Sequence, residues 1–243
     1  MRICATCSTP TVRDTVSAQQ AYFTRFYPRE PSPFVPRGHH LVSLRLVGLR
    51  PDALVFYFAA RGIERLDEAI VDRDVAYGRL ENSGVVRTDA AGTAVFVLRC
   101  PVVYRVENDK IFPRHVHFVY RDGESWGKRL YTHRIDCPIN KTTVRRFPGV
   151  LRIDARYASG ADALPGAIAI PVSQQRIGRQ QVRTRLGLSA SAHPGEIPLI
   201  VYCSDEACSA SERVIDRLAA LGFVNTFWYR GGVRDWWSQR KIE

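Results

Sequence analysis

The stretch Val201-Tyr202-Cys203-Ser204-Asp205-Glu206-Ala207-Cys208-Ser209-Ala210-Ser211 decides how the second half of this chain is built. Before it, the apolar and β-branched residues 197–203 predict a buried strand. After it, residues 211–221 place apolar side chains at helical spacing and meet a stop signal at Gly222. Cys203 therefore ends a strand just before a helix, and reactive groups gather at the carboxyl ends of strands in an open parallel sheet.

A cysteine in this position can be interpreted in two opposite ways, as a reactive nucleophile or as an inert buried residue. The backbone N–H groups of a loop and the positive end of a helix favour thiolate over thiol, which would make Cys203 a nucleophile at neutral pH. Free cysteines are also often buried and inert. The position of Cys203 alone leaves both interpretations open.

The chain falls into two parts with different hydrophobic patterns. Short apolar or alternating runs separated by Gly, Pro and Asp in residues 1–140 predict an all-β sandwich. Beyond residue 149, strands alternate with helices, which predicts an α/β domain with a parallel sheet and helices on both faces. The basic segment 141–149, with Pro148-Gly149, is typical of a linker. We therefore expect a two-domain protein with domains at 1–140 and 150–243.

Composition limits the surroundings and partners of the protein. The 243 residues carry 35 Lys and Arg against 24 Asp and Glu, a net charge of +11. This charge is diffuse, without a run of five basic residues, so it does not favour nucleic acid as a partner. No apolar run reaches the length of a membrane span, and no secretory signal is visible at the N-terminus. We expect a cytoplasmic protein without a membrane partner.

Four ordered segments of the second part resemble the rhodanese (sulfurtransferase) family. They are Leu151-Arg152-Ile153-Asp154-Ala155-Arg156, Ala163-Leu164-Pro165-Gly166-Ala167-Ile168-Ala169-Ile170-Pro171, Ile200-Val201-Tyr202-Cys203 and Tyr229-Arg230-Gly231-Gly232-Val233-Arg234-Asp235-Trp236. The resemblance implies a rhodanese-like domain at 150–243 that needs no cofactor. Its catalytic residue would be Cys203, whose thiolate attacks the outer sulfur of a donor such as thiosulfate and forms a persulfide. Asp154 and Arg156 would be supporting residues.

The resemblance also assigns an active-site loop that departs from the family pattern. The loop, whose N–H groups would stabilise the persulfide, comprises Ser204, Asp205, Glu206, Ala207, Cys208 and Ser209. Asp205 and Glu206 stand where family members often carry basic residues, so they would repel an anionic donor. Cys208 closes the loop, and a Cys203–Cys208 disulfide would bring redox-switched or resolving-cysteine chemistry. The sulfur donor and acceptor, small molecules or proteins, stay open.

A pair of histidines lies in the first part. On a strand, His115 and His117 point to the same face and can offer two imidazoles to one metal, with Tyr104 and Tyr77 as oxygen ligands. Alternatively, they line a solvated face and bind nothing.

Three segments around these histidines resemble intradiol ring-cleavage dioxygenases. They are Thr88-Asp89-Ala90-Ala91-Gly92-Thr93-Ala94-Val95-Phe96, Cys100-Pro101-Val102-Val103-Tyr104 and Pro113-Arg114-His115-Val116-His117-Phe118. The resemblance implies a β-sandwich in which Tyr104, His115 and His117 hold a non-haem ferric iron, with Tyr77 as the second tyrosinate. The iron would activate an aromatic catecholate for attack by oxygen.

The sequence leaves three hypotheses about function open. The first is a sulfurtransferase acting through Cys203, fused to a dioxygenase-like sandwich. The second is a non-haem iron dioxygenase whose rhodanese-like domain is regulatory or inactive. The third is a protein in which both folds are interaction modules without catalysis.

Overall fold

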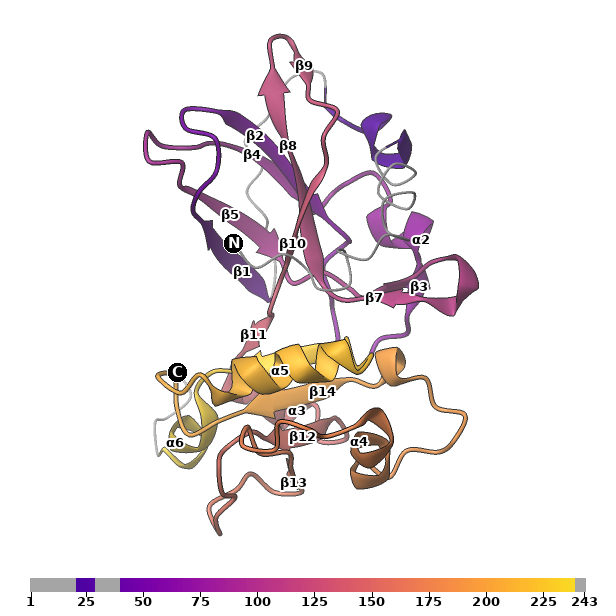
Figure 1. Ribbon diagram of the computed structural model, residues 1–243, viewed down its shortest axis with the longest axis vertical. Coiled ribbons are helices and arrows are strands. Elements are labelled where there is room, and N and C mark those ends of the chain that lie inside the picture. The colour runs from indigo at the N-terminus through magenta and orange to yellow at the C-terminus, as the bar shows by residue number, and fades with distance from the viewer. Residues whose placement is uncertain (1–20, 29–39, 239–243) are drawn as a thin grey trace. The chain divides into compact units, whose positions relative to one another are not determined.

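The computed structural model describes residues 21–28 and 40–238 (Figure 1). The chain divides into two compact units. Unit 1 comprises residues 1–64 and 70–135, and unit 2 comprises residues 65–69 and 136–243.

Unit 1 is built mainly from antiparallel strands. The larger sheet has the order β10-β8-β2-β4, with β9 paired to β8, and a separate pair joins β1 to β5. Strand β2 lies at the centre of the larger sheet and is almost fully buried, which explains its continuous apolar sequence. The bounds of these strands are β1 Leu41–Leu46, β2 Leu54–Ala59, β4 Ser83–Arg87, β5 Ala94–Arg99, β8 His115–Asp122, β9 Ser125–Trp126 and β10 Tyr131–Arg134.

Unit 1 also contains short helices, so the expectation of an all-β unit is not confirmed. A small sheet of β3 (Val71–Asp72), β6 (Tyr104–Arg105) and β7 (Ile111–Phe112) adjoins helix α2 (Arg73–Tyr77). A short 3-10 helix, η2 (Glu107–Asp109), links β6 to β7. The α2 helix is stabilised by burial of its last two side chains rather than by length, and a five-residue helix has too little periodicity to be visible in sequence.

Unit 2 contains the predicted parallel sheet. Its strand order is β11-β15-β14-β12-β13, and every neighbouring pair is parallel. The strands are β11 Pro138–Ile139, β12 Leu151–Asp154, β13 Ile168–Ala169, β14 Leu199–Tyr202 and β15 Thr226–Tyr229.

Helices cover this sheet. They are α3 Lys141–Arg146, α4 Arg179–Arg185, α5 Ala210–Ala220 and α6 Gly232–Trp237, with a 3-10 helix, η3, at Pro194–Glu196. Apolar side chains of α4 and α5 pack on β12 and β14 in one buried cluster that includes Val182, Val214 and Val201. In Figure 1, α5 lies across strand β14. Side chains two residues apart along a strand point to the same face of the sheet. Cys203 therefore lies on the same face as Val201 and belongs to the same buried cluster.

The division between the units differs from the one that we expected. Residues 141–149 do not form a linker, because they begin with α3, and strand β11 before them pairs with β15 of unit 2. The Asn140 side chain accepts a hydrogen bond from Thr143 N and caps the helix, while Val144 is fully buried. The cap and this burial outweigh the loop-like composition of the segment.

Within residues 21–28 and 40–238, no helix is long and apolar enough to span a bilayer.

Candidate functional site

Cys203 lies immediately after β14, at the carboxyl end of the parallel sheet, and only 2% of its surface is exposed. Its sulfur is bonded to that of Cys208, with 6.1 Å between the two Cα atoms. This Cα separation is ordinary for a disulfide. The disulfide that the sequence made conceivable is therefore present, and the two cysteines enclose the predicted active-site loop.

The loop is folded around Asp205. The Asp205 carboxylate accepts a hydrogen bond from Ala207 N at 3.0 Å, and the Asp205 carbonyl accepts one from Cys208 N at 3.2 Å. These two backbone N–H groups are thus directed at Asp205 and not at a bound group. The side chains of the other loop residues lie at the surface, namely Ser204, Glu206, Ala207 and Ser209.

Helix α6 supports the loop from its other side. Val233 N donates to the Cys203 carbonyl at 3.1 Å, and Arg234 N donates to the Ser204 carbonyl at 2.9 Å. Gly232 permits this approach, because its φ is +56° and a Cβ there would collide with the Cys203 carbonyl oxygen. The backbone at Cys203 is therefore fixed both by the sheet and by the start of α6.

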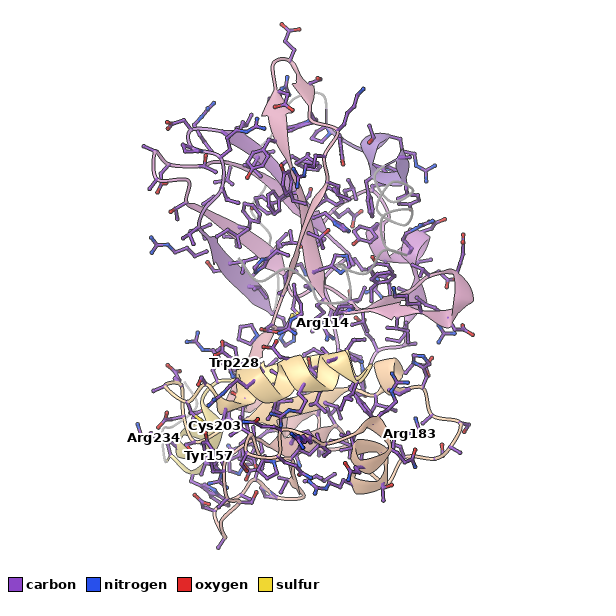
Figure 2. All side chains as sticks on the ribbon, viewed as in Figure 1. Arg114, Tyr157, Arg183, Cys203, Trp228 and Arg234 are labelled. Carbon is purple, nitrogen blue, oxygen red and sulfur yellow. A yellow bond between two sulfur atoms is a disulfide. The ribbon has the colours of Figure 1, made fainter. Side chains whose placement is uncertain are left out.

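Arg234 is a candidate that the sequence reasoning missed. Its guanidinium lies 3.2 Å from the Asp205 carboxylate and is largely exposed (Arg234 and Cys203 are labelled in Figure 2). It lies two residues after the Gly231-Gly232 pair of the closing segment, which was the available signal. Arg234 places a positive charge beside a loop that otherwise carries two carboxylates.

The supporting pair Asp154 and Arg156 lies at the end of β12. The Arg156 guanidinium donates to both carboxylate oxygens of buried Asp154, at 2.7 to 3.1 Å, and to Asp162 at 2.9 Å. Burial alone would raise the pKa of Asp154, but the hydrogen bonds from Arg156 outweigh burial and hold this pKa below its usual range. The pair joins the end of β12 to the segment that follows it and does not touch the sulfur atoms in any contact described.

In unit 1, the four predicted metal ligands meet at one point. His115 Nε2 lies 3.1 Å from Tyr77 Oη, 3.2 Å from Tyr104 Oη and 3.1 Å from His117 Nε2. The two tyrosine oxygens are 3.5 Å apart. All four side chains are buried, so the solvated-face alternative for the histidines is wrong.

The outer nitrogens of both imidazoles are held by other groups. His115 Nδ1 lies 2.6 Å from the Pro113 carbonyl oxygen, and His117 Nδ1 lies 2.8 Å from Thr132 Oγ1. Because a carbonyl only accepts, Nδ1 of His115 carries the proton, and Nε2 of the neutral ring presents a lone pair to the cluster. Burial, with a smaller contribution from His115, lowers the pKa of His117 well below its usual range.

An aromatic side chain packs against the cluster of two tyrosines and two histidines. Phe23 is fully buried, and its ring centroid lies 4.6 Å from that of Tyr77 and 5.1 Å from that of His117. In the described part of the chain, no group of three or more His, Cys, Asp and Glu side chains could hold a metal ion. A metal ion in the cluster of unit 1 would therefore need the two tyrosines as oxygen ligands.

Comparison with known proteins identifies a rhodanese-like domain at residues 148–239. This match includes the β12, β14 and α6 segments that surround Cys203. No curated protein matches the chain.

Several solved structures are similar to part of the chain. The BH2092 protein of Bacillus halodurans is 22% identical, with 41% of this chain and 69% of that chain covered and a TM-score of 0.33. An uncharacterized protein from Saccharomyces cerevisiae is 19% identical over 43% of this chain and 92% of its own, with a TM-score of 0.33. The single domain sulfurtransferase RDL2 of Saccharomyces cerevisiae is 18% identical over 44% and 92%, with a TM-score of 0.34.

Proposed function

We propose that unit 2 is a sulfurtransferase in which Cys203 carries the transferred sulfur as a persulfide. The observation that carries the proposal is the place of Cys203, at the carboxyl end of β14 within the rhodanese-like match. Helix α6 and the sheet hold the backbone of this residue from two sides. Such positioning keeps a nucleophile in line with a donor that binds over the loop.

The proposed reaction begins with reduction, because the sulfur of Cys203 is bonded to Cys208. A thiol reductant opens the disulfide, and the Cys203 thiolate then attacks the outer sulfur of a donor such as thiosulfate. Sulfite leaves with the electron pair of the broken S–S bond, and Cys203 holds the persulfide. A negatively charged donor is opposed by Asp205 and Glu206 and attracted by Arg234.

Intact-mass measurement tests this proposal. Because Cys208 can bond to Cys203 again, the test uses the reduced Cys208→Ser chain. We expect this chain to gain about 32 Da after incubation with thiosulfate or inorganic polysulfide, and peptide mapping to locate the added sulfur on Cys203. The Cys203→Ser variant should take up none. Equal uptake by the Cys203→Ser variant, or no uptake by the Cys208→Ser chain from either donor, would refute the proposal.

We propose a second function for unit 1, a metal centre formed by Tyr77, Tyr104, His115 and His117. The distances between their donor atoms support it. Two ligands bonded to one ion at about 2.0–2.1 Å lie roughly 3 Å apart, and the four separations described are 3.1 to 3.5 Å. The carbonyl of Pro113 and the hydroxyl of Thr132 orient the two imidazoles, as partners of metal-bound histidines do.

The alternative to a metal is a crowded set of hydrogen bonds. Two hydroxyls and one imidazole then surround the single lone pair of His115 Nε2, which three donors cannot share well. A cation at their centre would satisfy all four atoms. Two tyrosines and two histidines suit ferric iron, which would supply Lewis acidity toward an aromatic diol.

Metal analysis of the purified full chain tests the second proposal. We expect about one iron per chain after reconstitution and a visible tyrosinate-to-iron absorption band. Both should be lost in His115→Ala and kept in His193→Ala, since His193 lies in unit 2 outside the cluster. Iron content that is absent, or unaffected by His115→Ala, would contradict the metal centre.

A further inference from the structure

We propose that Cys208 is a resolving cysteine, whose thiolate attacks a persulfidated Cys203 and releases the outer sulfur as sulfide. This inference rests on the proposed sulfur transfer at Cys203. It makes unit 2 a sulfide-releasing enzyme that consumes a dithiol reductant, rather than one that passes sulfur only to an external acceptor.

The first support is the bond between the two sulfurs. Cys208 reaches Cys203 while the surrounding structure keeps its hydrogen bonds, including those of Val233 N to Cys203 and Cys208 N to Asp205. The Cα separation of 6.1 Å lies in the ordinary range for a disulfide. Attack on Cys203 Sγ therefore needs no rearrangement of the sheet or of α6.

The second support is the difference in exposure. Cys203 is buried, and Cys208 is half-buried in the same loop. An external acceptor has to reach the buried sulfur from solvent, whereas Cys208 is already within bonding distance. An intramolecular nucleophile held in this way has a large advantage over one in dilute solution.

The third support is the fold of the loop on Asp205. The Asp205 carboxylate and carbonyl accept hydrogen bonds from Ala207 N and Cys208 N, which holds residues 205–208 in a closed turn. This turn returns the chain toward Cys203 before α5 begins at Ala210. Asp205, which stands where a basic side chain is expected from the family resemblance, thus helps to place the second cysteine.

The proposed step balances as follows. The Cys208 thiolate attacks Cys203 Sγ, the S–S bond of the persulfide breaks, and HS⁻ leaves with the electron pair and takes a proton from water. The outer sulfur is reduced to sulfide and the Cys208 sulfur is oxidised from thiolate to disulfide, while the oxidation state of Cys203 Sγ does not change. A dithiol then attacks the disulfide and is itself oxidised, which restores both cysteine thiols.

A single-turnover experiment tests the step. The reduced wild type, Cys208→Ser and Cys208→Ala chains, freed of reductant, are mixed with excess thiosulfate and followed by intact mass and by released sulfide. We expect the wild type to release about one sulfide per chain and to end as the disulfide. Both variants should keep the added sulfur on Cys203, with a persulfide lifetime at least ~10-fold longer. Equal persulfide lifetimes in all three chains would overturn the inference.

A second measurement separates this inference from the proposed function. If neither Cys208 variant takes up sulfur from thiosulfate or polysulfide, the sulfurtransferase proposal fails. The resolving step can still be examined in reverse, by adding sulfide to the oxidised wild-type chain and mapping the new persulfide after alkylation. Sulfur found on Cys203 means that sulfide attacked Cys203 Sγ and that the Cys208 thiolate was the leaving group. This result supports Cys208 as the attacking group in the forward step. Sulfur found only on Cys208, or on neither residue, refutes it.

Discussion

The guanidinium of Arg234 lies 3.2 Å from the carboxylate of Asp205, so the first turn of α6 contributes a charge to the loop that follows β14. Arg234 N also donates to the Ser204 carbonyl, which fixes the backbone from which the side chain extends. Because the guanidinium is mostly exposed, it can interact with an approaching anion as well as with Asp205.

Arg234→Ala should therefore weaken the reaction with an anionic donor and leave stability unchanged. We expect persulfide formation from thiosulfate to slow about fivefold at low salt, and the effect to shrink at high salt, where exposed charges are screened. An uncharged organic trisulfide should react at the wild-type rate. Arg230→Ala is the control, because Arg230 stacks on Trp228 and has no described contact with Asp205. An equal slowing in both variants would contradict this role of Arg234.

Gly232→Ala should disturb Cys203 directly. The new methyl group meets the carbonyl oxygen of Cys203 and lies 2.8 Å from the Ser204 carbonyl carbon, at a φ of +56°. We expect a loss of about 2 kcal/mol in the free energy of unfolding beyond that of Gly187→Ala, and at least ~10-fold slower persulfide formation. Gly187 is the matched control, since its φ is also positive (+63°) but open space surrounds it. Similar losses in the two variants would show that only the backbone conformation matters.

Asp154→Asn should lower the free energy of unfolding of unit 2 and reduce the dependence of this free energy on pH. Removing the charge leaves the largely buried side chain of Arg156 with exposed Asp162 as its remaining described carboxylate partner, so we expect a loss of about 3 kcal/mol at neutral pH in urea unfolding. The pKa of Asp154 is lowered in the folded chain. The folded state therefore binds fewer protons, and the stabilisation is present above the unfolded pKa of about 3.9 and is lost as the pH falls through the folded value. The variant should lack this acid-side decline. An unchanged decline below about pH 4 would assign it to other carboxylates.

Tyr77→Phe should distinguish the contribution of Tyr77 Oη to the proposed metal centre from the packing of the ring. Phe23 and Phe58 contact the ring of Tyr77, and the substitution keeps these contacts while it removes Oη. After reconstitution with iron, we expect the visible tyrosinate band to fall to roughly half, because one of two such ligands is lost. Tyr57→Phe is the control, since Tyr57 is also buried in unit 1 but stacks on Phe96 outside the cluster. A band of wild-type strength in Tyr77→Phe would exclude Tyr77 as a ligand.

The sequence was informative where short-range patterns are sufficient. Apolar runs and helical spacing located β14 and α5, and hence the position of Cys203 between them. Periodicity also predicted the parallel sheet of unit 2. The spacing of His115 and His117 placed both imidazoles on one face of β8, because side chains alternate along a strand. The roles of these residues remain predictions.

Other features depended on contacts between distant segments. Tyr77 reaches the histidines because α2 and β8 fold against each other, and Arg234 reaches Asp205 because α6 returns to the carboxyl end of β14. Residues 141–146 are helical because Val144 is buried in unit 2, although their composition is that of a linker.

The sequence by itself thus determined the local elements and the place of Cys203 at a strand end, since local hydrogen bonding and side-chain alternation repeat with fixed periods. Only the tertiary structure decided that Cys208 bonds to Cys203 and that four ligand candidates share one point. Such contacts depend on the path of loops and on the packing of segments far apart in the chain. The spacing of residues along the sequence does not encode either of them.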